Sequence, residues 1–338
     1  MTIPLASIPH FTSEQALEVA RRDYGIDGRI APLPSERDQN FLIEDPGRGK
    51  VVLKIANRRD PPSLLEFQHE AMRHVAAAVR DCRVQDVLPT RAGAEMSAIH
   101  DPASGVSHRV RVLSWIDGEV LATVRPRSAQ LFESIGACMA QVDAALADFE
   151  HPAMHRVLQW DLRHAGLARE KTALLPSARR AQVESALDEW ERIDWRQLRH
   201  GVIHGDANDH NVLVEGGRMA GLLDFGDMTY SAAVCELAIA LAYAMLREPE
   251  PLAAARCLIR GYHRRHPLGE AEQAVLFPLV RARLAASVCY SAHNRARSPL
   301  DAYQVISEAG AWELLDKLDA FSSAAAIATV REACAPIA

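Results

Sequence analysis

Three polar residues in the second half of the chain have types and an order that could serve one reaction. Asp206 and Asn211 lie in the run His204–Asn211, and Asp224 opens the later run Asp-Phe-Gly-Asp. Carboxylate and amide oxygens are hard ligands that suit Mg²⁺, and phosphoryl transfer needs such a cation to neutralise phosphate charge. We expect Asp224 and Asn211 to hold Mg²⁺, and Asp206 to orient an attacking hydroxyl and take its proton as general base.

The spacing of these residues is typical of the catalytic loop of kinases. An Asp stands five positions before an Asn, apolar residues 212–214 and a glycine pair follow, and a second loop then supplies Asp-Phe-Gly. A hydrolytic metal cluster is the alternative, but the histidine spacings do not match a zincin helix; its members would be His200, His204, His210, Asp206 and Asp224. For His204 we favour a structural, hydrogen-bonding role within the loop.

A lysine in the first third of the chain is a candidate for phosphate binding. Lys54 lies in the apolar run Val51–Ile55, and a lysine on a third strand can reach the α- and β-phosphates of a nucleotide. Glu70 follows sixteen positions later on a predicted helix and could pair with Lys54 to hold it in place. The alternative is a solvated strand end and an ordinary helix charge.

Other nucleotide contacts are expected from two segments. Where a glycine-rich loop would stand, the chain has residues 33–41 without the GxGxxG pattern, and Ser35, Arg37 and Gln39 could contact phosphate or form a plain polar turn. Backbone groups just before Asp117-Gly118 would contact the base; these belong to Leu113, Ser114, Trp115 and Ile116.

The elements that position these residues follow from periodicity and turn chemistry. Apolar or alternating runs predict an antiparallel sheet with strands at 30–33, 40–44, 50–55, 95–100 and 108–116. Helices are predicted from residue 12 or 13 to about 23 and over 64–80, and the chain is mostly helical after 129, apart from short strands near 212–214 and 220–224. We expect an α+β, bilobal, protein-kinase-like fold with a nucleotide-binding lobe at 1–116 and a catalytic, substrate-binding lobe at 117–338.

Over nearly its whole length the chain resembles the aminoglycoside phosphotransferase and choline kinase superfamily. Beyond the catalytic loop, the run Ser35–Phe41 resembles hydroxylysine kinases and the kinase domains fused to class III aminotransferases. Three further runs share this likeness: His151-Pro152, Trp160-Asp161-Leu162 and Asp224–Met228. The resemblance implies an ATP- or GTP-dependent kinase acting on a small amino alcohol or hydroxy amino acid, with hydroxylysine the leading candidate. Homoserine, choline, ethanolamine, methylthioribose and aminoglycosides remain open as acceptors.

An ammonium-bearing acceptor favours carboxylates and aromatic faces around it. Candidates in the second lobe are Asp227, Tyr230, Glu236 and Tyr262. Glu236 stands in an apolar helix, where an unpaired carboxylate is costly, so an internal partner such as Arg283 is the favoured interpretation. Arg283 could instead bind a substrate carboxylate in a bidentate manner, or be structural.

Composition excludes some functions and leaves others open. The net charge is −6 with scattered basic residues, which disfavours nucleic acid as a partner. The six cysteines are far apart and predicted to be reduced thiols, and the longest apolar run, 232–246, is shorter than the roughly 20 residues that cross a bilayer. Residues 1–10 lack a basic start, so we expect a cytoplasmic enzyme without a membrane partner, as a monomer or homodimer. A catalytically inactive ligand-binding module and a protein kinase are the competing classes.

Overall fold

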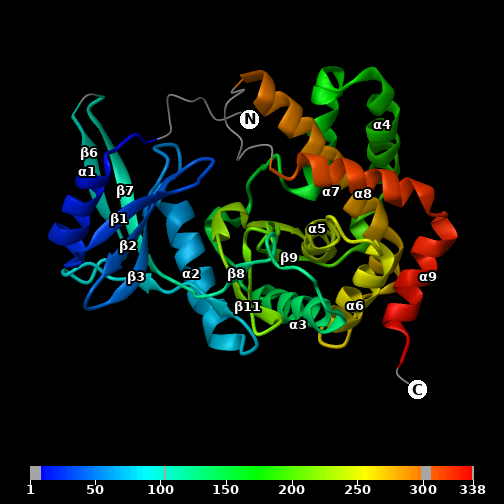
Figure 1. Cartoon of the computed structure of the whole chain (residues 1–338), viewed down its shortest axis with the longest axis horizontal. Coiled ribbons are helices and arrows are strands. Elements are labelled where there is room, and N and C mark those ends of the chain that lie inside the picture. Colours follow the sequence, from blue (N-terminus) through cyan, green and yellow to red (C-terminus); the bar gives the residue numbers. More distant parts are fainter. Residues whose placement is uncertain (1–8, 103, 298–305, 337–338) are drawn as a thin grey trace. The chain divides into compact units, whose positions relative to one another are not determined.

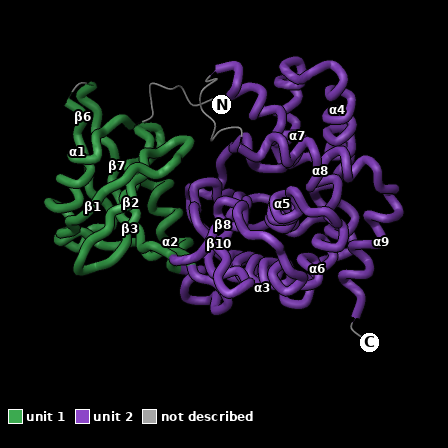
Figure 2. The backbone as a smooth tube through the Cα atoms, in the orientation of Figure 1, with its two compact units in different colours: residues 1–73, 84–116 green, residues 74–83, 117–338 purple. Residues whose placement is uncertain are grey.

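The computed structural model describes residues 9–102, 104–297 and 306–336, which form two compact units. Unit 1 comprises residues up to 73 together with 84–116, and unit 2 comprises 74–83 together with residues from 117 onward (Figure 2). The long helix α2 (Pro62–Ala78) therefore begins in unit 1 and ends in unit 2. Each unit is described by itself below.

Unit 1 is built on an antiparallel sheet in the order β1-β2-β3-β7-β5, with β6 also pairing with β7 (Figure 1). The strands are β1 (Arg29–Leu33), β2 (Gln39–Asp45), β3 (Gly49–Ile55), β5 (Val87–Leu88), β6 (Ser97–Asp101) and β7 (Val106–Ser114). The five predicted strands are confirmed. The two-residue strand β5 is an addition, too short to show an alternating pattern in the sequence.

The two faces of this sheet carry different residues because side chains alternate along each strand. One face packs on α1 (Ser13–Val19) and the π-helical turn Ala20–Tyr24, and its core includes Phe41, Leu53 and Val112. The predicted first helix is thus confirmed, and Thr12 caps it in a capping box with Gln15. The opposite face carries Lys54.

Unit 2 is mainly helical, as predicted. Its helices are α3 (Ala129–Leu146), α4 (Ser177–Glu191), α5 (Val234–Ala244), α6 (Pro251–His263), α7 (Glu270–Arg297), α8 (Glu308–Ala320) and α9 (Ser323–Cys334). Helix α5 is buried along its whole length and packs on α3, α6 and α7 (Figure 1). The apolar run of the sequence around 232–246 is therefore a core helix.

Short strands in unit 2 support the loops that carry the candidate site. One sheet has the order β4-β11-β10-β8, formed by β4 (Arg83–Val84), β8 (Glu119–Val120), β10 (Val212–Glu215) and β11 (Arg218–Leu222). A second ladder pairs β9 (His200–Ile203) with β12 (Thr229–Ala232). Because β9 leads into the run around Asp206 and β12 follows Asp224, these ladders bring the two loops together.

Helix α7 is the one described helix whose length and apolar composition would allow it to cross a membrane. Its most apolar window is 78% buried inside the structure, which is the pattern of a core helix. The six cysteines are free thiols, as predicted.

Candidate active site

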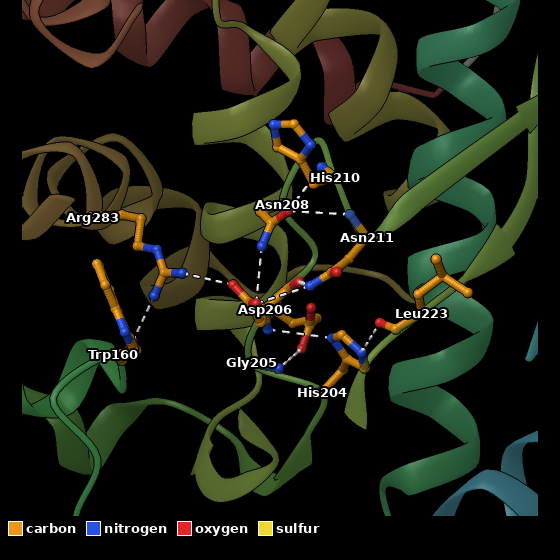
Figure 3. Close-up of polar contacts among 10 residues, drawn as sticks. Trp160, His204, Gly205, Asp206, Asn208, His210, Asn211, Leu223 and Arg283 are labelled. Atoms are coloured by element: carbon orange, nitrogen blue, oxygen red, sulfur yellow. Dashed lines mark hydrogen bonds and ion pairs between the residues drawn. The ribbon is translucent and has the colours of Figure 1, made fainter. Parts of the chain in front are cut away.

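The loop from His204 to Asn211 connects β9 to β10 and places Asp206 at its centre (Figure 3). Gly205 has a φ of +79°, and a Cβ at this position would lie 2.7 Å from the carbonyl oxygen of Asp227. Only glycine combines that left-handed backbone with such a close approach. The loop therefore depends on Gly205 for its path.

His204 is fully buried and holds the loop together. The Asp206 N–H donates to its Nδ1 at 3.3 Å, so Nε2 carries the proton and donates to the carbonyl oxygen of Leu223 at 3.0 Å. The imidazole also meets the Phe225 ring edge to face, with centroids 4.8 Å apart. These contacts support the predicted structural role, and no group of three or more potential His, Cys, Asp or Glu ligands lies together among the described residues. The hydrolytic metal cluster is thus not formed.

Both carboxylate oxygens of Asp206 are oriented by neighbouring side chains (Figure 3). Oδ2 accepts from Nδ2 of Asn208 and from Nδ2 of Asn211, each at 2.9 Å. Oδ1 accepts from Nη2 of Arg283 at 2.9 Å. The side chain is 20% exposed, so the carboxylate is held by three N–H donors and still reaches solvent.

The charge state of Asp206 reflects opposing effects. Burial raises its pKa above the usual range, the Arg283 guanidinium lowers it, and the negative charge of Asp227 raises it again. A carboxyl group whose pKa is perturbed in this way is typical of a site of proton transfer.

Arg283 reaches Asp206 from helix α7. Its Nη1 donates to the carbonyl oxygen of Trp160 at 2.8 Å, and the guanidinium lies 4.7 Å from the Trp160 ring centroid and 5.4 Å from that of Tyr243. The residue is 2% exposed, so a carboxylate and two aromatic faces stabilise a buried cation. The sequence offered Arg283 as one candidate partner for Glu236. The actual partner of Arg283 is Asp206.

Asp224 begins the second loop of the site. Its φ is +57°, and its side chain accepts a hydrogen bond from the Gly226 N–H at 3.1 Å. The preceding Leu223 N–H donates to the carbonyl oxygen of Asn211 at 2.9 Å. Backbone bonds thus bring the two predicted metal ligands, Asn211 and Asp224, onto adjoining segments.

Two of the predicted substrate residues are not placed to meet a substrate. Glu236 is completely buried, and its Oε2 accepts from the Gly205 N–H at 2.7 Å. Tyr262 is also completely buried and donates its hydroxyl to Asp143 of α3. An internal partner for Glu236 is confirmed, but that partner is a backbone group of the catalytic loop. Glu236 thus supports the catalytic loop, and Tyr262 links α6 to α3.

The other two candidates, Asp227 and Tyr230, are partly exposed. The Tyr230 ring contacts two imidazoles, with its centroid 4.9 Å from that of His155 and 6.1 Å from that of His200. A substrate role for Asp227 and Tyr230 stays a prediction.

In unit 1, Lys54 is 6% exposed and stands between Asn40 and Arg111 in the ladder of β2, β3 and β7. The expected pair with Glu70 is not formed: Glu70 is exposed on α2, and among the described residues it takes part in no ion pair. Gln68 is among the buried residues of α2, and it accepts from Nη1 of Arg111 at 2.6 Å. Helical phase turns Glu70 away from the face that Gln68 occupies.

Gln39 and Ser114, two of the predicted nucleotide contacts, form hydrogen bonds with other parts of unit 1. The Gln39 side-chain amide forms two hydrogen bonds with the backbone of Phe11: its Oε1 accepts from the Phe11 N–H and its Nε2 donates to the Phe11 carbonyl oxygen, both at 2.7 Å. Ser114 donates its N–H to the carbonyl oxygen of Asp86 at 2.8 Å and accepts from Gln85 Nε2 at 2.9 Å. Gln39 therefore fastens the segment before α1, and Ser114 fastens the end of β7.

The remaining nucleotide candidates stay predictions. Ser35 and Arg37 are partly exposed in the β1–β2 turn. Trp115 carries the Lys50 ammonium 5.6 Å from its ring centroid, and Ile116 is buried. Lys54 and these residues belong to unit 1, whereas the loops of Asp206 and Asp224 belong to unit 2.

Comparisons with known proteins agree with this local geometry. The family model described as "Phosphotransferase enzyme family" (APH) matches residues 29–273. Hydroxylysine kinase of Mus musculus is 32% identical over 341 residues, covering 92% of this chain and 90% of the relative. A homoserine kinase of Rhodospirillum rubrum is 28% identical over 252 residues, covering 72% and 73%.

Solved structures show the same fold at lower sequence identity. A microcompartment-associated aminopropanol kinase has a TM-score of 0.71 at 18% identity, covering 91% of this chain and 97% of that one. An amicoumacin kinase solved with AMP-PNP and Ca²⁺ has a TM-score of 0.68 at 17% identity, covering 91% and 94%. With the family model matching residues 29–273 and the murine relative covering 92% of the sequence, the chain belongs to the APH phosphotransferase enzyme family and is a small-molecule kinase.

Proposed function

We propose that this kinase transfers the γ-phosphoryl group of ATP or GTP to a hydroxyl of an amino alcohol or hydroxy amino acid, with 5-hydroxylysine as the leading acceptor. The observation that carries the chemistry is the carboxylate of Asp206, oriented by three donors in the loop and in α7. The acceptor class is supported by the hydroxylysine kinase relatives, of which the murine protein is 32% identical.

Counting lone pairs identifies which oxygen of Asp206 would accept the substrate hydroxyl. Each carboxylate oxygen offers two acceptor positions. Oδ2 uses both for the amides of Asn208 and Asn211. Among the described residues Oδ1 accepts only from Arg283, so it has one position left. The reacting hydroxyl would therefore bond to Oδ1, beside the guanidinium.

The proposed reaction transfers the phosphoryl group and one proton. The hydroxyl oxygen forms a bond to the γ-phosphorus while its proton passes to Oδ1 of Asp206, and the bond between the γ-phosphorus and the bridging oxygen breaks to release the nucleoside diphosphate. Arg283 and the two asparagines hold the carboxylate in line for this transfer. Proton acceptance by a positioned base contributes about 10² to 10⁴ in rate.

The donor set fits a divalent cation such as Mg²⁺. Because Nδ2 of Asn211 donates to Asp206, the amide is turned so that its Oδ1 accepts no hydrogen bond from the described residues. That oxygen and the Asp224 carboxylate are the hard ligands that Mg²⁺ prefers, and the cation would neutralise charge on the nucleotide phosphates. Lys54 would add a positive charge near the α- and β-phosphates.

Homoserine is the second candidate acceptor, favoured by the 28% identity to a homoserine kinase over 72% of the chain. Choline, ethanolamine and aminoglycosides follow. An ammonium group on any of these acceptors would favour the carboxylate of Asp227 and the ring of Tyr230.

The test is phosphate transfer by the purified protein with Mg²⁺ and either ATP or GTP across 5-hydroxylysine, homoserine, ethanolamine, choline and an aminoglycoside. We expect the highest kcat/KM with 5-hydroxylysine. Asp206→Asn should lower kcat by about 10² to 10⁴ and leave nucleotide binding intact, whereas Asp188→Asn on exposed α4 should change neither. Tight nucleotide binding without transfer to any acceptor would favour the inactive ligand-binding module.

A further inference from the structure

The turn between β1 and β2 occupies the place of a glycine-rich phosphate loop, yet it has no glycine between Leu33 and Phe41. A glycine-rich loop approaches phosphate through its backbone. A turn made of larger residues needs another means of holding its position. The structure shows that Asp38, at the end of this turn, supplies it.

Asp38 joins the β1–β2 turn to the turn that follows β3. Its Oδ1 accepts from the Asn57 N–H at 3.1 Å, and the Asn57 Nδ2 donates back to the carbonyl oxygen of Arg37 at 3.2 Å. Asn57 Oδ1 also accepts from the Arg59 N–H at 3.1 Å. Asn57 is 3% exposed, so these bonds are shielded from competing water.

The second oxygen of Asp38 faces a buried cation. Arg111 of β7 is 2% exposed, and its Nη2 lies 3.8 Å from Asp38 Oδ2. Its Nη1 donates to the neutral Gln68, and its Nε has no hydrogen-bond partner among the described residues. A buried guanidinium needs a negative partner, and Asp38 is the carboxylate that faces it.

This arrangement bears directly on Lys54. Strand register places Asn40 and Arg111 opposite Lys54 on the two neighbouring strands, so the three side chains share one face of the sheet. An uncompensated charge on Arg111 would repel the Lys54 ammonium on the neighbouring strand. By pairing with Arg111, Asp38 offsets one positive charge on the face of the sheet that carries Lys54.

We propose that Asp38 is the positioning residue of the nucleotide site, holding the β1–β2 turn against Asn57 and neutralising Arg111 beside Lys54. The inference rests on the proposed use of a nucleotide, but it concerns nucleotide binding rather than the choice of acceptor.

The test compares two changes at Asp38. Asp38→Asn keeps an acceptor for the Asn57 N–H and removes the charge, while Asp38→Ala removes both. We expect the Kd for AMP-PNP with Mg²⁺ to rise about tenfold in Asp38→Ala and less in Asp38→Asn. The KM for the acceptor should stay unchanged, and amide hydrogen exchange should accelerate at residues 35–40 and 57–60.

Controls separate this role from general destabilisation. Glu44→Gln, in the exposed pair with Arg29 on β2, should leave the Kd and the exchange unchanged. The double variant Asp38→Asn with Arg111→Gln removes both charges and should recover part of the lost affinity. Recovery would assign the effect to the ion pair rather than to the shape of the turn.

Unchanged affinity and unchanged exchange in Asp38→Ala would overturn the proposal, as would an equal loss in Glu44→Gln. Wild-type protein that binds AMP-PNP but transfers no phosphate would contradict the proposed acceptors only, because the Kd and the exchange still decide the role of Asp38. A wild type that does not bind AMP-PNP would overturn both.

Discussion

Glu236 offers a sharp test of how the catalytic loop is held in place. It is completely buried in α5, and its Oε2 accepts from the N–H of Gly205, the residue before Asp206. Its Oε1 has no hydrogen-bond partner among the described residues, and burial raises its pKa above the usual range. We infer that Glu236 stabilises the catalytic loop mainly by accepting this one hydrogen bond from the Gly205 N–H.

The size of the effect follows from comparing two substitutions of similar volume. Glu236→Gln keeps an acceptor oxygen for Gly205, whereas Glu236→Leu removes it and leaves the N–H buried without a partner. An unsatisfied buried donor costs about 1 to 3 kcal/mol. The Leu variant leaves the Gly205 N–H without an acceptor, and the Gln variant places amide hydrogens where Oε1 has no partner, so we expect both to unfold with a free energy about 1 to 3 kcal/mol lower than the wild type. Because both variants are destabilised, a difference in their kcat reports the position of the loop rather than general instability.

Activity should respond through the position of Asp206. Misplacing a reacting group by about 1 Å can cost about 10² in rate, so kcat of Glu236→Leu should fall well below that of Glu236→Gln. Urea unfolding and steady-state kinetics measure the two effects. The same pair of changes at the exposed Glu184 of α4 is the control. Equal kcat in the Gln and Leu variants would refute the role of the Gly205 bond.

Three further predictions concern stability. Arg127 is buried, donates to the carbonyl oxygens of Leu121 and Ala244 at 2.7 and 2.9 Å, and pairs with Glu248 at 3.4 Å. Because Arg127→Met would leave the buried Glu248 carboxylate without its partner, it should lower the free energy of unfolding in urea by about 3 to 5 kcal/mol; a loss below about 1 kcal/mol would contradict this. Gly261→Ala would place a Cβ 2.1 Å from the Glu133 carbonyl oxygen where α6 meets α3, so it should lower the free energy of unfolding by about 1 to 3 kcal/mol or more. Gly269→Ala, whose Cβ would have ordinary space, is the control, and equal midpoints of thermal unfolding in the two variants would count against this close packing. Burial and the Arg111 charge lower the pKa of His69 to about 4, below the unfolded value near 6.5. Acidification therefore protonates the unfolded state first, and the free energy of unfolding should fall between about pH 6.5 and 4, by at most about 1.4 kcal/mol per pH unit. Urea unfolding of His69→Gln should show a smaller change of this free energy with pH, and an unchanged pH dependence would refute the prediction.

Much of the fold could be predicted because it is encoded locally. Alternating apolar residues and turn chemistry located the five main strands of unit 1, and the cap-forming residues Thr12 and Ser13 marked the start of the first helix. The two-residue β5 was missed because a strand of that length has no period. The burial of α5 followed from its largely apolar composition, which only Glu236 interrupts.

The residues of the catalytic loop were identified from the sequence because they are close together along the chain. Asp206 and Asn211 are five positions apart, and a single hairpin separates them from Asp224. Their spacing alone predicted phosphoryl transfer, and the family matches agree with that chemistry. The structural role of His204 was also predictable, since its partners lie in the same loop and in the adjoining Leu223.

Contacts between distant segments were decided only by the tertiary structure. Arg283 is 77 residues from Asp206, and Glu236 is 31 residues from Gly205. The sequence showed that a charge in an apolar helix needs a partner, but several partners satisfied that condition equally. The rotation of α2 likewise decided that Gln68 and not Glu70 faces the sheet. Residue types and local spacing therefore determined the chemistry of this protein. Packing determined which side chains position the catalytic loop, because a hydrogen bond depends on positions in space that many sequence separations can satisfy.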